Sequence, residues 1–317
     1  MGRGAVAVMI EALPASRPGW RVHLVLGRVS NLPTVWSNCL AGVILAAALA
    51  VRPVPDPATL AVLIVALSLF YVGGMYLNDA CDHRWDQEHR SERPIPAGEI
   101  APATVYLLGF AMLAAGEVLL ALPGVWRAEY PYALVLGGGA ILGALIIYYD
   151  YRHKRDPLSP IVMALCRVMI YLIAAAAVAQ GPAEVLSSFV VGGTIVLAAY
   201  LIGLTYVAKQ ENLNELRNLW PLVFLVVPFA YASPLFATWN WGVLYYLVLL
   251  AWVIYALSFL MGRAERDIPR AVVSLIAGIS LLDGLLIATL PGHALWALPT
   301  VAAFALTLFF QKYVPGT

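Results

Sequence analysis

The sequence predicts an all-α integral membrane protein with nine or ten transmembrane helices in a single bundle. Composition is the first reason, because 62% of the 317 residues are hydrophobic, only 12% are charged, and the mean hydropathy is +0.83. Soluble domains carry about 25% charged residues, so this chain cannot cover a soluble surface and much of its solvent must be lipid. The second reason is a succession of apolar stretches about 20 residues long, the length that crosses a hydrocarbon core of about 30 Å.

Ten such stretches follow one another along the chain. Pro221, Pro228 and Pro234 interrupt the seventh, and the ninth and tenth are compatible with a kinked pair or a re-entrant segment, so the predicted count is nine or ten. Together they define one transmembrane domain over residues 32–312, preceded by a cytoplasmic or interfacial arm over residues 1–31. The stretches are 32–51, 58–78, 102–121, 131–149, 160–180, 185–207, 219–236, 241–262, 270–290 and 295–311.

The basic residues predict the orientation of these stretches. Only Arg52 and Arg127 fall in loops on one side, and Arg167 falls within a span. Because loops rich in lysine and arginine stay in the cytoplasm, the opposite side is predicted to be cytoplasmic, and the bias favours an even number of spans. The other 16 of the 19 basic residues lie on that side: Arg3, Arg17, Arg21, Arg28, Arg84, Arg90, Arg93, Arg152, Lys154, Arg155, Lys209, Arg217, Arg263, Arg266, Arg270 and Lys312.

Charge and cysteine content exclude other classes of protein. The formal net charge of +1 lacks the strongly basic face of a nucleic-acid-binding protein, so no nucleic-acid partner is expected. The three cysteines, Cys39, Cys81 and Cys166, are scattered, and Cys39 and Cys166 lie in apolar runs. They are interpreted as small core residues rather than as disulfides or metal ligands.

Acidic residues are scarce, and their densest cluster follows the second apolar stretch. Asn78, Asp82 and Asp86 are spaced four residues apart, and Asp79 precedes Asp82 by three. If the helix continues, the four side chains share one face, where like charges repel one another. A divalent cation would make such a stripe favourable, and oxygen ligands select a hard ion such as Mg²⁺. The alternative is an ordinary solvated helix end.

Arginines come directly after this cluster. Arg90 and Arg93 carry guanidinium groups that suit diphosphate oxygens, and Gly98 permits a turn before the next span. Carboxylates for a metal beside arginines for phosphate indicate a diphosphate–metal site rather than a calcium site.

Two further loops on the same side carry candidate residues. The first contains Lys154 and Arg155, although positive charges near a cytoplasmic membrane surface explain part of this loop without a site. The second contains Glu211 and Glu215, four residues apart, which would form a second carboxylate pair for a second Mg²⁺. Alternatively, Glu215 would neutralise Lys209 or a neighbouring arginine.

Polar side chains within the spans are candidates for function by default. Arg167 lies about 7 residues from the inner end of its helix and Asp283 about 13, a difference of roughly 9 Å at 1.5 Å per residue, so a direct pair is not indicated. Arg167 is shallow enough to reach toward the cytoplasmic site. Asn38, at mid-depth in the first span, also needs a polar partner, and a purely structural role remains open for all three.

At this point the pattern resembles a known family. Residues 78–86 followed by residues 93–98 resemble the first motif of the UbiA superfamily of intramembrane prenyltransferases, in the branch that holds chlorophyll synthases and archaeal digeranylgeranylglyceryl phosphate synthases. Residues 28–38 are similar to the start of that family's first helix. The pair Lys154-Arg155 resembles the basic pair of its middle cytoplasmic loop.

Two departures from the family pattern accompany this resemblance. The second motif of the family is Asp-rich, whereas this chain has Lys209, Glu211 and Glu215 in its place. Asp150 stands where a tyrosine usually precedes the lysine, here Lys154, by four residues. Both details are similar to a sub-branch, the UbiA-like EboC proteins.

The resemblance implies a UbiA-like bundle around a central cavity with cytoplasmic cap loops. It also implies Mg²⁺-dependent transfer of a prenyl group from an allylic prenyl diphosphate to an unidentified hydrophobic or aromatic acceptor, among membrane lipids. Two alternatives stay open: a phosphoribosyl-type transferase acting on a polyprenyl phosphate, and a non-catalytic carrier or flippase for prenylated lipids. The implied metal ligands are Asn78, Asp79, Asp82, Asp86, Glu211 and Glu215. The implied catalytic residues are Asp79, Asp82, Asp86 and Lys154. The implied substrate-binding residues are Asn38, Arg90, Arg93, Asp150, Arg155, Arg167 and Lys209.

Overall fold

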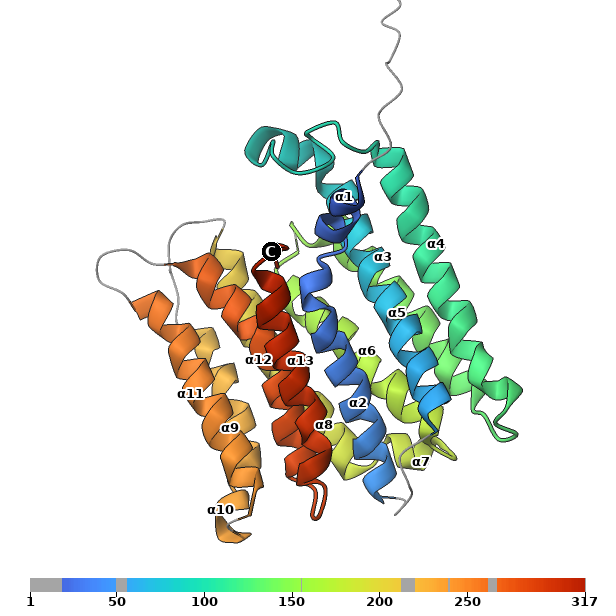
Figure 1. Cartoon of the computed structure of the whole chain (residues 1–317), viewed down its shortest axis with the longest axis vertical. Helices are drawn as coiled ribbons and strands as arrows, with labels where there is room; N and C mark the ends of the chain where they lie inside the picture. The colour runs from blue at the N-terminus through green and yellow to red at the C-terminus, as the bar shows by residue number, and fades with distance from the viewer. Residues whose placement is uncertain are drawn as a thin grey trace, which may run out of the picture.

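The chain folds into a bundle of long helices that run side by side (Figure 1). The computed structural model describes residues 19–49, 56–154, 156–211, 220–238, 240–261 and 267–316, and all regular structure within them is helical. Among these residues, ten helical segments are long and apolar enough to cross a membrane, which confirms the upper of the two predicted counts. The chain is therefore a multi-pass integral membrane protein.

Nine of the ten segments centre on one long α-helix each. The tenth is irregular, because a 3₁₀ helix (Trp220–Val226) precedes the short α9 (Val227–Ala232) and α10 (Leu235–Thr238) follows it. Its prolines remove backbone donors from the helical ladder, and Pro228 occupies the first turn of α9, where a missing N–H is tolerated. The long helices are α2 (Leu32–Leu49), α3 (Pro57–His89), α4 (Pro102–Ala121), α5 (Tyr132–Arg152), α6 (Ser159–Val178), α8 (Ser188–Glu211), α11 (Gly242–Met261), α12 (Ile268–Ala288) and α13 (Leu298–Gln311).

The helices at the centre of the bundle differ from those at its edge in burial. In the most apolar stretch of α12, 89% of the residues are buried, against 28% in α4 and in α11. The outer helices expose large apolar side chains such as Leu107, Val118, Leu244 and Ile254. Such a surface suits lipid rather than water, so the outer faces of helices such as α4 and α11 are suited to contact the bilayer.

The third helix, α3, is longer than a membrane is thick. Its 33 residues correspond to about 50 Å at 1.5 Å per residue, whereas the hydrocarbon core is about 30 Å. The Asp56 side chain caps its first turn by accepting a hydrogen bond from the Thr59 backbone N–H at 2.9 Å, and this bond lowers the pKa of Asp56. Figure 1 shows the far end of α3 rising above the ends of α2, α12 and α13. The acidic cluster lies on this projecting end.

A small apolar cluster holds the projecting end of α3 in place. The short α1 (Trp20–Leu26) packs Val22 and Leu26 against Tyr76 and Ala80 of α3, together with Ile95 from the following loop. His23 Nδ1 also lies 2.8 Å from the Tyr76 hydroxyl. The described part of the predicted N-terminal arm, residues 19–31, is therefore packed against the bundle.

Candidate functional site

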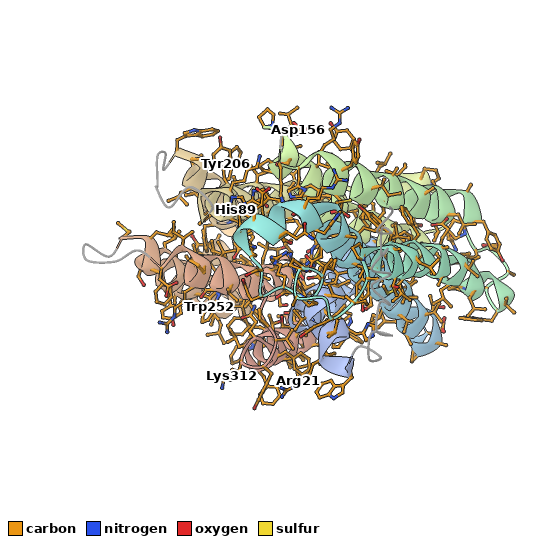
Figure 2. The ribbon with its side chains drawn as sticks, turned by 90° about the horizontal axis from the view of Figure 1, so that it is seen from above. Arg21, His89, Asp156, Tyr206, Trp252 and Lys312 are labelled. Atoms are coloured by element: carbon orange, nitrogen blue, oxygen red, sulfur yellow. The ribbon has the colours of Figure 1, made fainter. Side chains whose placement is uncertain are left out.

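The predicted polar stripe lies on one continuous helix. Because α3 runs unbroken to His89, Asn78, Asp79, Asp82 and Asp86 occupy successive turns of its projecting end. Asn78, Asp79 and Asp86 are buried, and the Asp82 side chain is only 13% exposed. This is unlike a solvated helix end, so the four side chains form an enclosed polar surface. Figure 2, which looks onto this end of the bundle, shows α3 near His89 crossing between Asp156 and Tyr206 on one side and Arg21 and Lys312 on the other.

Arg93 joins two carboxylates of this stripe. Its Nη1 lies 3.0 Å from Asp79 Oδ1 and 3.2 Å from Asp86 Oδ2. The loop that carries Arg93 folds back through turns, and Gly98 adopts a positive φ of 76° that glycine accepts without strain. The structure thus brings together Arg93, Asp79 and Asp86, all of which the sequence predicted to belong to one site.

A second guanidinium reaches the stripe from the segment before α2. Arg28 Nη2 lies 3.3 Å from Asp79 Oδ1 and 3.5 Å from Asn78 Oδ1. Burial opposes the charge of Arg28, but the Asp79 carboxylate stabilises it, and the net effect is a raised pKa for this guanidinium. Arg28 was missing from the predicted site residues. The available signal was a basic residue at the start of the first span, on the same side as the acidic cluster.

The residues directly after α5 supply the basic side chains that face Asp82. Lys154 Nζ lies 2.8 Å from Asp82 Oδ1, and His153 Nε2 lies 3.4 Å from Asp82 Oδ2. The same Lys154 ammonium lies 4.2 Å from the centre of the Trp85 ring, a cation–π contact. The structure places the predicted Lys154 beside the predicted Asp82. His153 and Trp85 are neighbours that sequence reasoning missed.

Asp150, another of the predicted substrate-binding residues, is buried beside Asn78. Asn78 Nδ2 donates a hydrogen bond of 3.1 Å to Asp150 Oδ1. The second carboxyl oxygen, Oδ2, is buried and has no hydrogen-bond partner among the described residues. A buried oxygen without a donor is costly, so this atom is a candidate acceptor for a bound molecule.

A cavity of about 220 Å³ opens inside the bundle next to these residues. Its walls come from α3, α5, α6, α8 and α12 and are mainly apolar. Arg28, Asp150 and Arg167 add charged groups to this lining. The predicted central cavity is therefore present, and the acidic stripe stands at one end of it.

Arg167 and Asn38, both predicted to bind substrate, meet in the core of the bundle. Arg167 Nη1 donates to Asn38 Oδ1 at 3.0 Å, and Asn38 Nδ2 donates to both oxygens of Asp283 at 3.0 and 2.9 Å. Asp283 also accepts a hydrogen bond from the Tyr171 hydroxyl. Arg167 and Asp283 are thus connected through the Asn38 amide, and no direct ion pair between them is found.

Other predicted residues lie apart from this cluster or outside the described residues. Lys209 Nζ donates to the Asp156 backbone carbonyl at 2.9 Å, so in this structure it holds the loop after α5. The Arg90 guanidinium lies 5.6 Å from the centre of the Trp85 ring. Arg155 and Glu215 fall outside the described residues, as does the side chain of Glu211. The roles predicted for these five residues stay predictions, as do the roles predicted for the residues that the structure brings together.

The donor set suits a hard cation only in part. Asp79, Asp82 and Asp86 offer the carboxylate oxygens that Mg²⁺ prefers, and Mg²⁺ needs only one or two of them when substrate phosphates and water complete its shell. Each of these carboxylates is, however, paired with a basic side chain, and no group of three or more acidic, histidine or cysteine residues within the described segments is arranged to hold a metal. The residues fit a metal that arrives with a phosphate ligand better than a metal alone.

Comparisons with known proteins point in one direction. A sequence model described as the UbiA prenyltransferase family matches residues 39–273. Digeranylgeranylglyceryl phosphate synthase of Methanopyrus kandleri is 28% identical over 199 residues, which are 62% of this chain and 64% of that protein. Protoheme IX farnesyltransferase of Geobacter sulfurreducens is 31% identical over 105 residues, which are 32% of this chain and 37% of that protein. The chain therefore matches less than two thirds of the length of either relative.

A solved structure has the same fold. It is described as giving structural and mechanistic insights into the biosynthesis of digeranylgeranylglyceryl phosphate synthase in membranes. The TM-score is 0.57 at 17% sequence identity, and the match covers 87% of this chain and 98% of that chain. At this identity the match establishes a shared arrangement of helices.

Proposed function

Because the chain belongs to the UbiA prenyltransferase family, we propose that it transfers a prenyl group from an allylic prenyl diphosphate to an acceptor within the membrane. One observation carries the proposal: a buried stripe of three carboxylates, ringed by Arg28, Arg93 and Lys154, stands at the end of an apolar cavity. Fixed cations suit a diphosphate, and apolar walls suit an isoprenoid chain. A phosphoribosyl donor would need a more polar cavity than this one.

Mg²⁺ would be held by Asn78, Asp79, Asp82 and Asp86, with Glu211 and Glu215 proposed as a further pair. When bound, it neutralises charge on the diphosphate. Arg93, Arg28 and Lys154 already lie within 3.3 Å of the stripe carboxylates, so small side-chain movements bring them onto diphosphate oxygens. There they stabilise the negative charge that grows as the carbon–oxygen bond breaks.

The cavity walls serve the second half of the reaction. The allylic cation that remains must be kept from water, and the lining around Phe70, Leu142 and Ile170 is apolar. A new bond then forms between the prenyl carbon and the acceptor nucleophile, whose proton is released, and diphosphate leaves. We place this end of the bundle in the cytoplasm, because 16 of the 19 basic residues are assigned to that side by the sequence.

The test is diphosphate release by the purified protein with labelled allylic diphosphates of several chain lengths, with Mg²⁺ and a membrane lipid extract. The wild type should release diphosphate, and Asp82→Asn should reduce the rate by at least about 100-fold, as expected when transition-state charge stabilisation is lost. Glu88→Gln makes the same chemical change at an exposed position of the same helix and should match the wild type. No release with any chain length would refute the proposal.

A non-catalytic lipid carrier is the second candidate. The observation that favours it is the pairing of every stripe carboxylate with a basic side chain, which leaves the described residues without a preformed metal site. A carrier would bind a prenyl diphosphate without releasing diphosphate. If the protein is a carrier, Asp82→Asn and the wild type should show the same lipid-transport activity. If it is an enzyme, Asp82→Asn should form much less prenylated product than the wild type.

A further inference from the structure

The proposed reaction leaves the charge of Arg167 unused. Arg167 is 8% exposed and lies eight residues into α6, about 12 Å along the helix axis. Asp150, at the edge of the acidic stripe, lies only two residues from its end of α5, about 3 Å along that helix. Arg167 is thus deeper in the cavity than the proposed diphosphate site, and a single diphosphate at the stripe would not need it.

Among the described residues, the hydrogen bonds that hold the Arg167 guanidinium all go from one nitrogen, Nη1, to helix α2. Its Nη1 donates to Thr34 Oγ1 at 3.1 Å and to Asn38 Oδ1 at 3.0 Å, two acceptors one turn apart on α2. Its plane also lies against Tyr71, with the central carbon 5.2 Å from the ring centre. These contacts fix the position of Arg167 while the structure gives no hydrogen bond from Nε or Nη2 to any described residue. A guanidinium can make five such bonds.

A purely structural ion pair does not account for this geometry. Arginine and a carboxylate in a core normally meet directly, often through two parallel hydrogen bonds. Here the Asp283 oxygens are occupied by Asn38 and Tyr171, and the Arg167 contacts among the described residues are with neutral groups. The carboxylates in its surroundings, Asp283 behind Asn38 and Asp150 in the lining of the same cavity, form no ion pair with Arg167 among the described residues, so donors of the guanidinium remain for an anionic ligand.

We propose that Arg167 binds an anionic group, a carboxylate or a phosphate, on the acceptor substrate. This inference rests on the proposed function, because it assigns the deeper part of the cavity to the second substrate. Asn38 and Asp283 act as positioning residues that hold the guanidinium at the wall. The acceptor nucleophile would then lie between Arg167 and the acidic stripe, where the prenyl carbon becomes available.

The test uses a matched set of amphiphiles that differ only in head group. Octyl phosphate, octanoate and octanol are titrated calorimetrically into detergent-solubilised protein. The anionic probes should bind more tightly than octanol. Arg167→Gln retains one donor for Asn38 and should weaken octyl phosphate binding at least about tenfold, the loss expected for a hydrogen-bonded charge, while octanol binding changes less than about twofold. Arg270→Gln, at an exposed position at the start of α12, is the control and should bind like the wild type.

Two additional variants make the test decisive. Arg167→Lys keeps the charge and should fold even if Arg167→Gln does not, with an intermediate loss of octyl phosphate affinity. Asp82→Asn should reduce diphosphate release from prenyl diphosphates by at least about 100-fold yet leave octyl phosphate binding intact, since it alters the other end of the cavity. A preference between octyl phosphate and octanoate would identify the anionic group.

The outcomes separate this inference from the proposed function. Octyl phosphate binding that depends on Arg167, in a protein that releases no diphosphate, would leave the anion site standing and remove the prenyl-transfer proposal. Equal binding of octyl phosphate and octanol would overturn the anion site whatever the enzyme assay gives. Loss of octyl phosphate binding in Lys154→Gln but not in Arg167→Gln would also overturn it, because the probe would then occupy the diphosphate site.

Discussion

Replacing Arg93 with glutamine tests whether the acidic stripe depends on its paired cations. Arg93 Nη1 contacts both Asp79 and Asp86, whose side chains are 7% and 2% exposed, so solvent screens these pairs only weakly. A hydrogen bond to a charged group is worth about 1.5–3 kcal/mol. Glutamine can replace at most part of these contacts and carries no charge, so we expect the free energy of unfolding to fall by about 2–3 kcal/mol. This is below most of the range of about 3–5 kcal/mol for a fully broken buried pair, because the Arg93 side chain is 15% exposed and glutamine retains a donor.

The assay is unfolding in mixed micelles with increasing sodium dodecyl sulfate, followed by circular dichroism. Arg84→Gln is the matched control, because Arg84 is exposed on the same helix and should change the free energy of unfolding by less than about 0.5 kcal/mol. Millimolar Mg²⁺ should restore part of the loss in Arg93→Gln, since a bound cation would supply the missing charge and stabilise the folded state. If Arg93→Gln is as stable as Arg84→Gln, the ion pairs do not organise this site.

Three other predictions concern the site and the packing of the bundle. Lys154→Gln removes the ammonium from Asp82 and should lower diphosphate release by about 10- to 1000-fold without unfolding the bundle, as measured by turnover and circular dichroism. Chelation with EDTA should stop diphosphate release while the unfolding transition of the wild type shifts little, because basic side chains already pair with the carboxylates. Gly42→Ala should destabilise the protein by about 1–3 kcal/mol, since a Cβ would lie 2.5 Å from the Tyr171 carbonyl oxygen, whereas Gly137→Ala, with open space at its Cβ, should stabilise it by up to about 1 kcal/mol. Equal effects at the two glycines in the same unfolding assay would contradict the packing of α2 against α6.

The features that sequence reasoning predicted are those set by local spacing. Asn78, Asp82 and Asp86 recur every four residues, so any helix through them must place them on one face. The prolines near residue 221 predicted an irregular seventh span, and a 3₁₀ segment is found there. Hydropathy predicted nine or ten spans, and the structure has ten among the described residues. Hydropathy is informative here because a chain that crosses lipid must form helices to satisfy its backbone hydrogen bonds.

The site contacts that the sequence did not predict join residues that are far apart in the chain. Arg28 and Asp79 are separated by 51 residues, and nothing local to either indicates the other. The depths of Arg167 and Asp283 did not indicate a direct pair, and they could not predict that Asn38 connects the two residues. Lys209 was predicted to bind substrate from its family position, and its contact with the Asp156 carbonyl depends on how two loops meet.

The pairing of carboxylates with cations on α3 has a consequence for which molecules can occupy the site. Three carboxylates, Asp79, Asp82 and Asp86, contact three basic side chains, Arg28, Arg93 and Lys154, so the carboxylates of the stripe are already paired within the protein. A free metal ion that binds the carboxylates would displace the basic side chains and leave them without negative partners. A free diphosphate that binds the basic side chains would leave the carboxylates without positive partners. Only a molecule that brings both charges at once can take over both sets of contacts. The site would therefore bind the metal–diphosphate complex much more tightly than it binds either the free metal ion or free diphosphate.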